Sequence, residues 1–168
     1  MAIVYLGLGS NLGDRQGFLD RALGFLRAHE AIQVLKVSSV IETQPQGVPP
    51  QPLFLNAAAE IKTDLLPLEL LSQLKIIERR LGRRAQSDSL SPRPIDLDIL
   101  FYGDGVIFGG KSLTIPHPRL SERRFVLEPL AEIAPDFVHP KLKKSVRELL
   151  QNLTHAPSSE HQAASTSS

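Results

Sequence analysis

Two aspartates separated by one residue are the sharpest chemical signal in the sequence. Asp96 and Asp98 lie in the segment 95–102, whose alternating apolar residues predict a β-strand. Residues two apart on a strand project from the same face, so the two carboxylates should converge. Without a thiolate or a nearby histidine, such a pair suits Mg²⁺, which takes one or two carboxylates together with substrate phosphates and water. We therefore expect Asp96 and Asp98 to hold a metal, and two solvated aspartates on an exposed strand are the alternative.

Arginines are concentrated in the part of the chain that contains the two aspartates. Residues 79–128 carry nine basic and six acidic side chains, and eight of the nine are arginine. Guanidinium groups donate bidentate hydrogen bonds to phosphate, so this segment would suit phosphate binding. Its excess of positive charge is too small for a surface that binds duplex nucleic acid. Arg83 and Arg93, in the polar loop 83–94, are candidates for binding a polyphosphate. Arg123 could equally be a helix-surface residue.

Two further polar residues are candidates, each with a structural alternative. His117 lies between two prolines and could donate to a phosphate or a ring, or be an ordinary surface histidine. Asn56 interrupts an apolar strand and needs a partner, which a bound amide-like heterocycle or the backbone would supply. The glycines of residues 7–13 have the wrong spacing for a dinucleotide-binding fingerprint, and the sequence contains no P-loop motif.

The elements that must position these residues follow from hydrophobic periodicity and from turn residues. Strands are expected at 3–9, 33–42, 54–63, 95–102 and 113–115, and helices at 15–29, 67–81, 121–133 and 141–153. The order β-α-β-β-α-β of the first six predicts an α+β fold with the ferredoxin-like split βαβ arrangement, in which helices cover one face of an antiparallel sheet.

Length and composition place limits on the class of protein. With 168 residues the chain predicts one domain over 1–155, followed by a Ser/Ala-rich tail, 156–168, that we expect to be disordered. No apolar run is long enough for a membrane span, no export signal is visible, and cysteine is absent, so a cytoplasmic protein is the simplest expectation.

Taken together and in order, the motifs resemble those of the 6-hydroxymethyl-7,8-dihydropterin pyrophosphokinase family of folate biosynthesis. The matching segments are YLGLGSNLGDR (5–15), ET-x-P-x-G (42–47), QPLFLNAA (51–58), IERRLGR (77–83), SPRPIDLDIL (91–100), IPHPRLSERRFVLEPL (115–130) and EIAP (132–135). The resemblance implies that ATP donates its β,γ-pyrophosphoryl unit to the hydroxymethyl group of the pterin and leaves as AMP. It also implies two Mg²⁺ ions bridged by Asp96 and Asp98.

The resemblance further assigns residues to each substrate. Asp96, Asp98, Arg83 and Arg93 would be the catalytic group, and the loops 44–53 and 83–94 would be mobile lids. The pterin would be stacked between the rings of Phe54 and Phe125, and its polar edge would be bound by Asn56 and Thr43 with backbone of the 44–47 loop. Gln46 and Asp96 would complete the pterin-binding set. ATP would be bound by Leu71, Glu78, Arg83, Arg93, Ile99, Thr114, His117 and Arg123.

Two other functions fit parts of the pattern. Split βαβ folds often bind single-stranded RNA on their sheet, but this chain has 5% aromatic residues and lacks the aromatic-rich motif of such modules. A nucleotidyltransferase could also use a D-x-D pair with magnesium. The expected partners are ATP and hydroxymethyl-dihydropterin, with neither nucleic acid nor membrane, and the expected state is a monomer.

Overall fold

The computed structural model describes residues 1–44, 51–84 and 91–154. The predicted tail 156–168 and the central parts of both polar loops, including Gln46, lie outside the described residues. In chain order the elements are β1 (Ala2–Ser10), α1 (Arg15–Ala28), β2 (Ile32–Val37), β3 (Ile41–Thr43), β4 (Phe54–Thr63), α2 (Pro67–Arg80), β5 (Asp96–Tyr102), β6 (Ile107–Phe108), β7 (Thr114–Ile115), α3 (Arg124–Ile133) and α4 (Val146–Thr154), with short 3₁₀ turns at Gly110–Ser112 and Leu120–Glu122.

The main sheet has the strand order β2-β4-β1-β5, and every neighbouring pair is antiparallel. The short strand β3 extends the sheet by pairing with the beginning of β4. Strand β4 therefore lies between β1 and β2, and β1 lies between β4 and β5, which is the split βαβ arrangement. The predicted α+β, ferredoxin-like class is confirmed.

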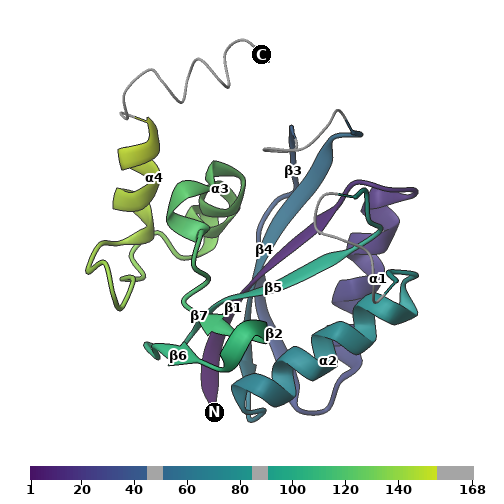
Figure 1. Cartoon of the computed structure of the whole chain (residues 1–168), viewed down its shortest axis with the longest axis horizontal. Helices are drawn as coiled ribbons and strands as arrows, with labels where there is room; N and C mark the ends of the chain where they lie inside the picture. Colours follow the sequence, from purple (N-terminus) through teal and green to yellow (C-terminus); the bar gives the residue numbers. More distant parts are fainter. Residues whose placement is uncertain (45–50, 85–90, 155–168) are drawn as a thin grey trace.

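Helices cover both faces of this sheet, so the expectation of helices on one face was wrong. Along β1, Val4 and Leu6 belong to one apolar core with residues of α1 and α2, whereas Tyr5 belongs to a second core with residues of α3 and α4. Figure 1 shows α1 and α2 on one side of the sheet and α3 and α4 on the other. The prediction considered only the helices that connect sheet strands, while α3 and α4 come after the last of them.

The strand expected over 33–42 is two strands, because serine hydroxyls interrupt it. Ser38 Oγ accepts a hydrogen bond from the backbone N–H of Ala58 at 2.8 Å, and Ser39 donates from its hydroxyl to Glu132 of α3 at 2.6 Å. These side-chain bonds replace ladder bonds between β2 and β3. Strand β6, which pairs with β7 in a small second sheet, lies in a segment that was predicted only as a glycine-rich turn.

The helix ends follow the predicted capping chemistry in the first half of the chain. Asp14 accepts a hydrogen bond from the Gly17 N–H at 3.1 Å and begins α1, and Pro67 is the first residue of α2. The two later helices begin at 124 and 146, after 3₁₀ or irregular turns, rather than at 121 and 141. In the described ranges no helix is both long and apolar enough to cross a membrane.

Candidate active site

Strand β1 carries glycine where its neighbours carry polar side chains. Gly9 pairs with Asn56 on β4 and with Asp96 on β5, and Gly7 pairs with Asp98 on β5. Residues directly opposite each other in a sheet project from the same face. The amide and the two carboxylates therefore border a strip of bare backbone, on the face whose other half is covered by α3.

Asn56 lies close against this strip and has a partner in the protein. A Cβ atom added to Gly9 would lie 3.1 Å from Asn56 Oδ1, so glycine gives the amide its space. The Asn56 side chain is buried, and its Nδ2 donates to Thr43 Oγ1 at 2.7 Å. The partner that Asn56 was expected to need is thus a threonine hydroxyl of β3.

The strip forms part of a cavity of about 1010 Å³. Every predicted site residue that the structure describes lines it. From the sheet and the loops beside it these are Thr43, Phe54, Asn56, Arg83, Arg93, Asp96, Asp98, Ile99, Thr114 and His117, and from helix α2 and the start of α3 they are Leu71, Glu78, Arg123 and Phe125.

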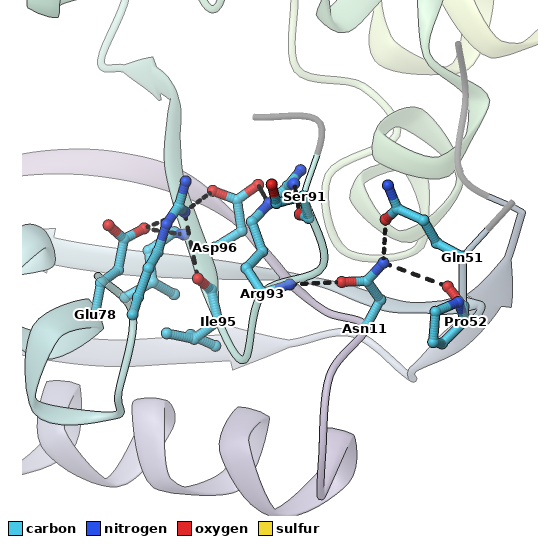
Figure 2. A network of polar contacts seen from close by, with 10 residues as sticks. Asn11, Gln51, Pro52, Glu78, Ser91, Arg93, Ile95 and Asp96 are labelled. Carbon is cyan, nitrogen blue, oxygen red and sulfur yellow. Dashed lines mark hydrogen bonds and ion pairs between the residues drawn. The ribbon is translucent and has the colours of Figure 1, made fainter. Parts of the chain in front are cut away.

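Asp96 is held between two guanidinium groups. Arg83 Nη1 donates to Asp96 Oδ1 at 2.7 Å, and Arg93 Nε lies 3.4 Å from Asp96 Oδ2 (Figure 2). All three side chains are mostly buried, so solvent screens these ion pairs less than it would on the surface. Burial lowers and the Asp96 carboxylate raises the pKa of Arg83, with a net upward shift.

Glu78 closes the edge of the sheet beside Asp96. β5 is an edge strand, and Glu78 Oε2 accepts the backbone N–H of Leu97 at 2.8 Å and lies 3.3 Å from Arg83 Nη1. Burial raises the pKa of Glu78, and the Leu97 hydrogen bond and Arg83 oppose that rise. The residue expected near adenosine thus has a structural partner as well.

Asp98 differs from Asp96 in lacking such a partner. Among the described residues no group donates a hydrogen bond to its carboxylate. Burial, together with the negative charges of Asp96 and Glu78, raises the pKa of Asp98 to about 8. A cation at this point would relieve the repulsion between the carboxylates, so the donor set fits Mg²⁺.

The two carboxylates would leave most coordination positions of such an ion to other ligands. No group of three or more His, Asp or Glu side chains that could hold a metal occurs in the described ranges. Mg²⁺ is commonly held by one or two carboxylates and completed by phosphate oxygens and water.

Each predicted aromatic residue has an arginine over its ring. The Arg93 Cζ atom lies 5.1 Å from the ring centroid of Phe54, and the Arg123 Cζ atom lies 5.6 Å from that of Phe125. Burial, followed by the positive charge of Arg123, lowers the pKa of His117 below its ordinary value, which favours the neutral imidazole. Positive charge and aromatic surface therefore meet at two places in the cavity lining.

Sequence reasoning missed two residues near the site. Lys75 lines the cavity and lies on α2 between Leu71 and Glu78, four residues from one and three from the other, so helical spacing could have identified it. Asn11 is fully buried and contacts two loops at the cavity. No local pattern indicates that role.

Comparison with known proteins identifies the family to which these residues belong. Residues 5–135 match the family model described as 7,8-dihydro-6-hydroxymethylpterin-pyrophosphokinase (HPPK). The chain is 43% identical over 157 residues to the 2-amino-4-hydroxy-6-hydroxymethyldihydropteridine pyrophosphokinase of Aquifex aeolicus, covering 94% of this chain and 96% of that protein. It is 50% identical over 131 residues to the Bacillus subtilis protein of the same name, covering 78% and 77% respectively.

Longer proteins contain a similar region. The folic acid synthesis protein fol1 of Pneumocystis carinii is 44% identical over 150 residues, which are 89% of this chain and 20% of that protein. The solved structure of wild-type Plasmodium falciparum HPPK-DHPS with SDX-DHP has a TM-score of 0.71 at 18% identity, covering 90% of this chain and 43% of that chain, and at this identity the likeness supports the fold alone. The matched segment 5–135 contains the glycine strip, both aspartates and both aromatic residues, and the chain belongs to the HPPK family of pyrophosphokinases.

Proposed function

We propose that this protein transfers the β,γ-pyrophosphoryl unit of MgATP to the hydroxymethyl group of 6-hydroxymethyl-7,8-dihydropterin and releases AMP. The observation that carries the proposal is the row Asn56, Gly9 and Asp96 across three strands. It puts an amide suited to a heterocycle and a carboxylate suited to a metal on either side of one bare backbone strip, within a single cavity.

On the nucleotide side, charge is the dominant requirement. Asp96 and Asp98 would hold two Mg²⁺ ions, which would neutralise the charge that develops on the phosphate oxygens. Arg83, Arg93 and Arg123 would donate to the same oxygens, and neutral His117 would donate one N–H. Adenosine would lie against Leu71, Glu78, Ile99 and Thr114, all of which line the cavity.

On the pterin side, shape and hydrogen bonding select the substrate. Phe54 and Phe125 would stack on the ring, which would replace part of their contact with the guanidinium groups. The paired side chains of Thr43 and Asn56 would bind its polar edge, with Gln46 and Asp96 completing the set. Holding the hydroxymethyl oxygen in line with the β-phosphorus would then supply much of the rate enhancement.

We further propose that the protein acts as a monomer. The test of the reaction is to incubate the protein with MgATP and the hydroxymethylpterin and to separate the nucleotide products by ion-exchange chromatography. We expect one AMP for each pterin diphosphate. ADP would contradict pyrophosphoryl transfer, and AMP retained on the pterin with free pyrophosphate would indicate a nucleotidyltransferase.

A further inference from the structure

Asn11 connects the two loops that flank the cavity. It directly follows β1, and its side chain is fully buried. Its Oδ1 accepts the backbone N–H of Arg93 at 2.9 Å, and its Nδ2 donates to Gln51 Oε1 at 2.9 Å and to the Pro52 carbonyl at 3.3 Å (Figure 2). The backbone N–H of Asn11 also donates to the Arg93 carbonyl at 3.1 Å.

The orientation of the Asn11 amide is set by two backbone groups, one of which can only donate and the other only accept a hydrogen bond. An N–H group such as that of Arg93 can only donate, so it requires the oxygen of Asn11. A carbonyl such as that of Pro52 can only accept, so it requires the nitrogen. Both halves of the amide are thus assigned, and exchanging them would break both contacts.

The two contacts lead to residues with different proposed roles in the cavity. Arg93 lies beside Asp96, at the proposed phosphate side. Pro52 stands two residues before Phe54, which begins β4 at the proposed pterin side. The Arg93 guanidinium also lies over the Phe54 ring, so the two sides meet at the residues that Asn11 holds.

We propose that Asn11 is a positioning residue that holds the phosphate side through its oxygen and the pterin side through its nitrogen. Its substrates are those of the proposed function, on which this inference rests. The oxygen fixes the backbone of Arg93, and the nitrogen fixes the backbone that leads into Phe54. Each half of the amide therefore supports the binding of a different substrate.

Two substitutions separate these halves. Asn11→Asp keeps an oxygen for the Arg93 N–H but cannot donate to the Pro52 carbonyl, whereas Asn11→Ala removes both contacts. Asn152→Asp makes the same chemical change at an exposed residue of α4 that does not line the cavity, and it serves as the control. For each variant, the dissociation constants of hydroxymethylpterin and of MgATP with a methylene α,β-bridge are measured, together with the melting temperature.

We expect Asn11→Asp to weaken pterin binding about tenfold, the effect of losing roughly one hydrogen bond, while the nucleotide dissociation constant stays within about threefold of wild type. Asn11→Ala should weaken pterin binding and nucleotide binding about tenfold each. Asn152→Asp should change neither dissociation constant. Equal losses in Asn11→Asp for both ligands, or no loss for either, would show a purely structural role and overturn the proposal.

A further variant covers the case in which Asn11→Ala does not fold. Gln51→Ala removes one acceptor of Nδ2 and leaves the Arg93 contacts in place, so it should weaken pterin binding and spare the nucleotide. Unchanged pterin binding in both Gln51→Ala and Asn11→Asp would contradict the proposal. Failure of the wild-type protein to form AMP would instead contradict the proposed function. The role of Asn11 is tested by dissociation constants and not by turnover, so the two proposals can fail separately.

Discussion

Asp96 and Asp98 are chemically identical side chains with different surroundings. Arg83 and Arg93 neutralise Asp96, whereas Asp98 lies against other carboxylates without a hydrogen-bond donor from the described residues. A carboxyl whose pKa is raised by burial and by like charges makes the folded protein less stable once it ionises. A bound cation would remove that penalty, so the proposed metal site would couple metal binding to stability.

The pH dependence of stability should reveal this coupling. The folded-state pKa of Asp98, about 8, lies above its unfolded value. The folded state therefore holds the proton more tightly, and its stability falls as pH rises between the two values. In EDTA at pH 8.5, Asp98→Asn should raise the melting temperature by about 4 °C or more, for a gain of at least about 2 kcal/mol.

Calorimetry at several pH values checks this result. Below pH 4 the difference between wild type and Asp98→Asn should disappear, because the carboxyl is then protonated in both states. Mg²⁺ should raise the melting temperature of wild type at pH 8.5 and leave that of Asp98→Asn nearly unchanged. A wild-type protein that is more stable than the variant at pH 8.5 without metal would contradict the assignment.

Phe125 tests the pterin side at the same scale. Phe125→Ala should weaken pterin binding by about tenfold or more, because it removes one stacking surface, and should change nucleotide binding little. Phe125→Leu keeps apolar bulk without a ring, so its pterin affinity should lie between those of wild type and Phe125→Ala. Fluorescence titration of the pterin and calorimetric titration of the nucleotide measure both constants, and an equal loss for the two ligands would refute the placement of Phe125.

Strands β1 and β5 determine where these side chains can lie. β1 contributes only backbone to the cavity floor, and β5 contributes both carboxylates. A β-bulge then shifts the register, so that Leu100 and Phe101 both join the core under α3 while Ile99 belongs to the opposite core. The bulge thus ends the polar segment of β5 and begins its buried one.

The glycine strip of β1 can be tested with two matched substitutions. Gly9→Ala puts a Cβ atom 3.1 Å from Asn56 Oδ1, so the amide must shift, and we expect pterin binding to weaken about tenfold, the cost of one misaligned hydrogen bond. At Gly7 the nearest atom to an added Cβ is a Leu100 methyl carbon at 3.4 Å, an ordinary van der Waals distance, so Gly7→Ala should leave pterin affinity nearly unchanged. Equal effects of the two substitutions on pterin binding would contradict the role assigned to Gly9.

Predictions from the sequence succeeded where the physical cause is local. The two-residue period of a strand placed Asp96 and Asp98 on one face, and Asp14 and Pro67 marked helix starts through capping. The break in the strand over 33–42 could not be predicted, because it depends on Glu132 of α3, which is 93 positions from Ser39. The second helix layer was missed for a related reason, since α3 and α4 pack on strands far away in sequence.

At the scale of the whole molecule, the cavity is assembled from segments between β1 and α3, together with Leu153 of α4. The site residues were predicted from the resemblance to a family, and those that the structure describes all line this cavity. Their roles stay predictions until they are tested. The role of Asn11 lay beyond sequence reasoning, because its partners Gln51 and Arg93 are 40 and 82 positions away. Such long-range contacts follow from the fold rather than from a local pattern.

Transfer of an intact pyrophosphoryl unit is tested most directly by ³¹P NMR of the complete reaction with MgATP and hydroxymethylpterin. We predict that AMP and a pterin carrying two coupled phosphorus atoms appear together at equal rates, that ADP is absent throughout, and that Asp96→Asn lowers the rate by about a thousandfold. ADP accumulating beside a pterin monophosphate, or an Asp96→Asn variant as active as wild type, would contradict the proposed reaction and the proposed metal site on β5.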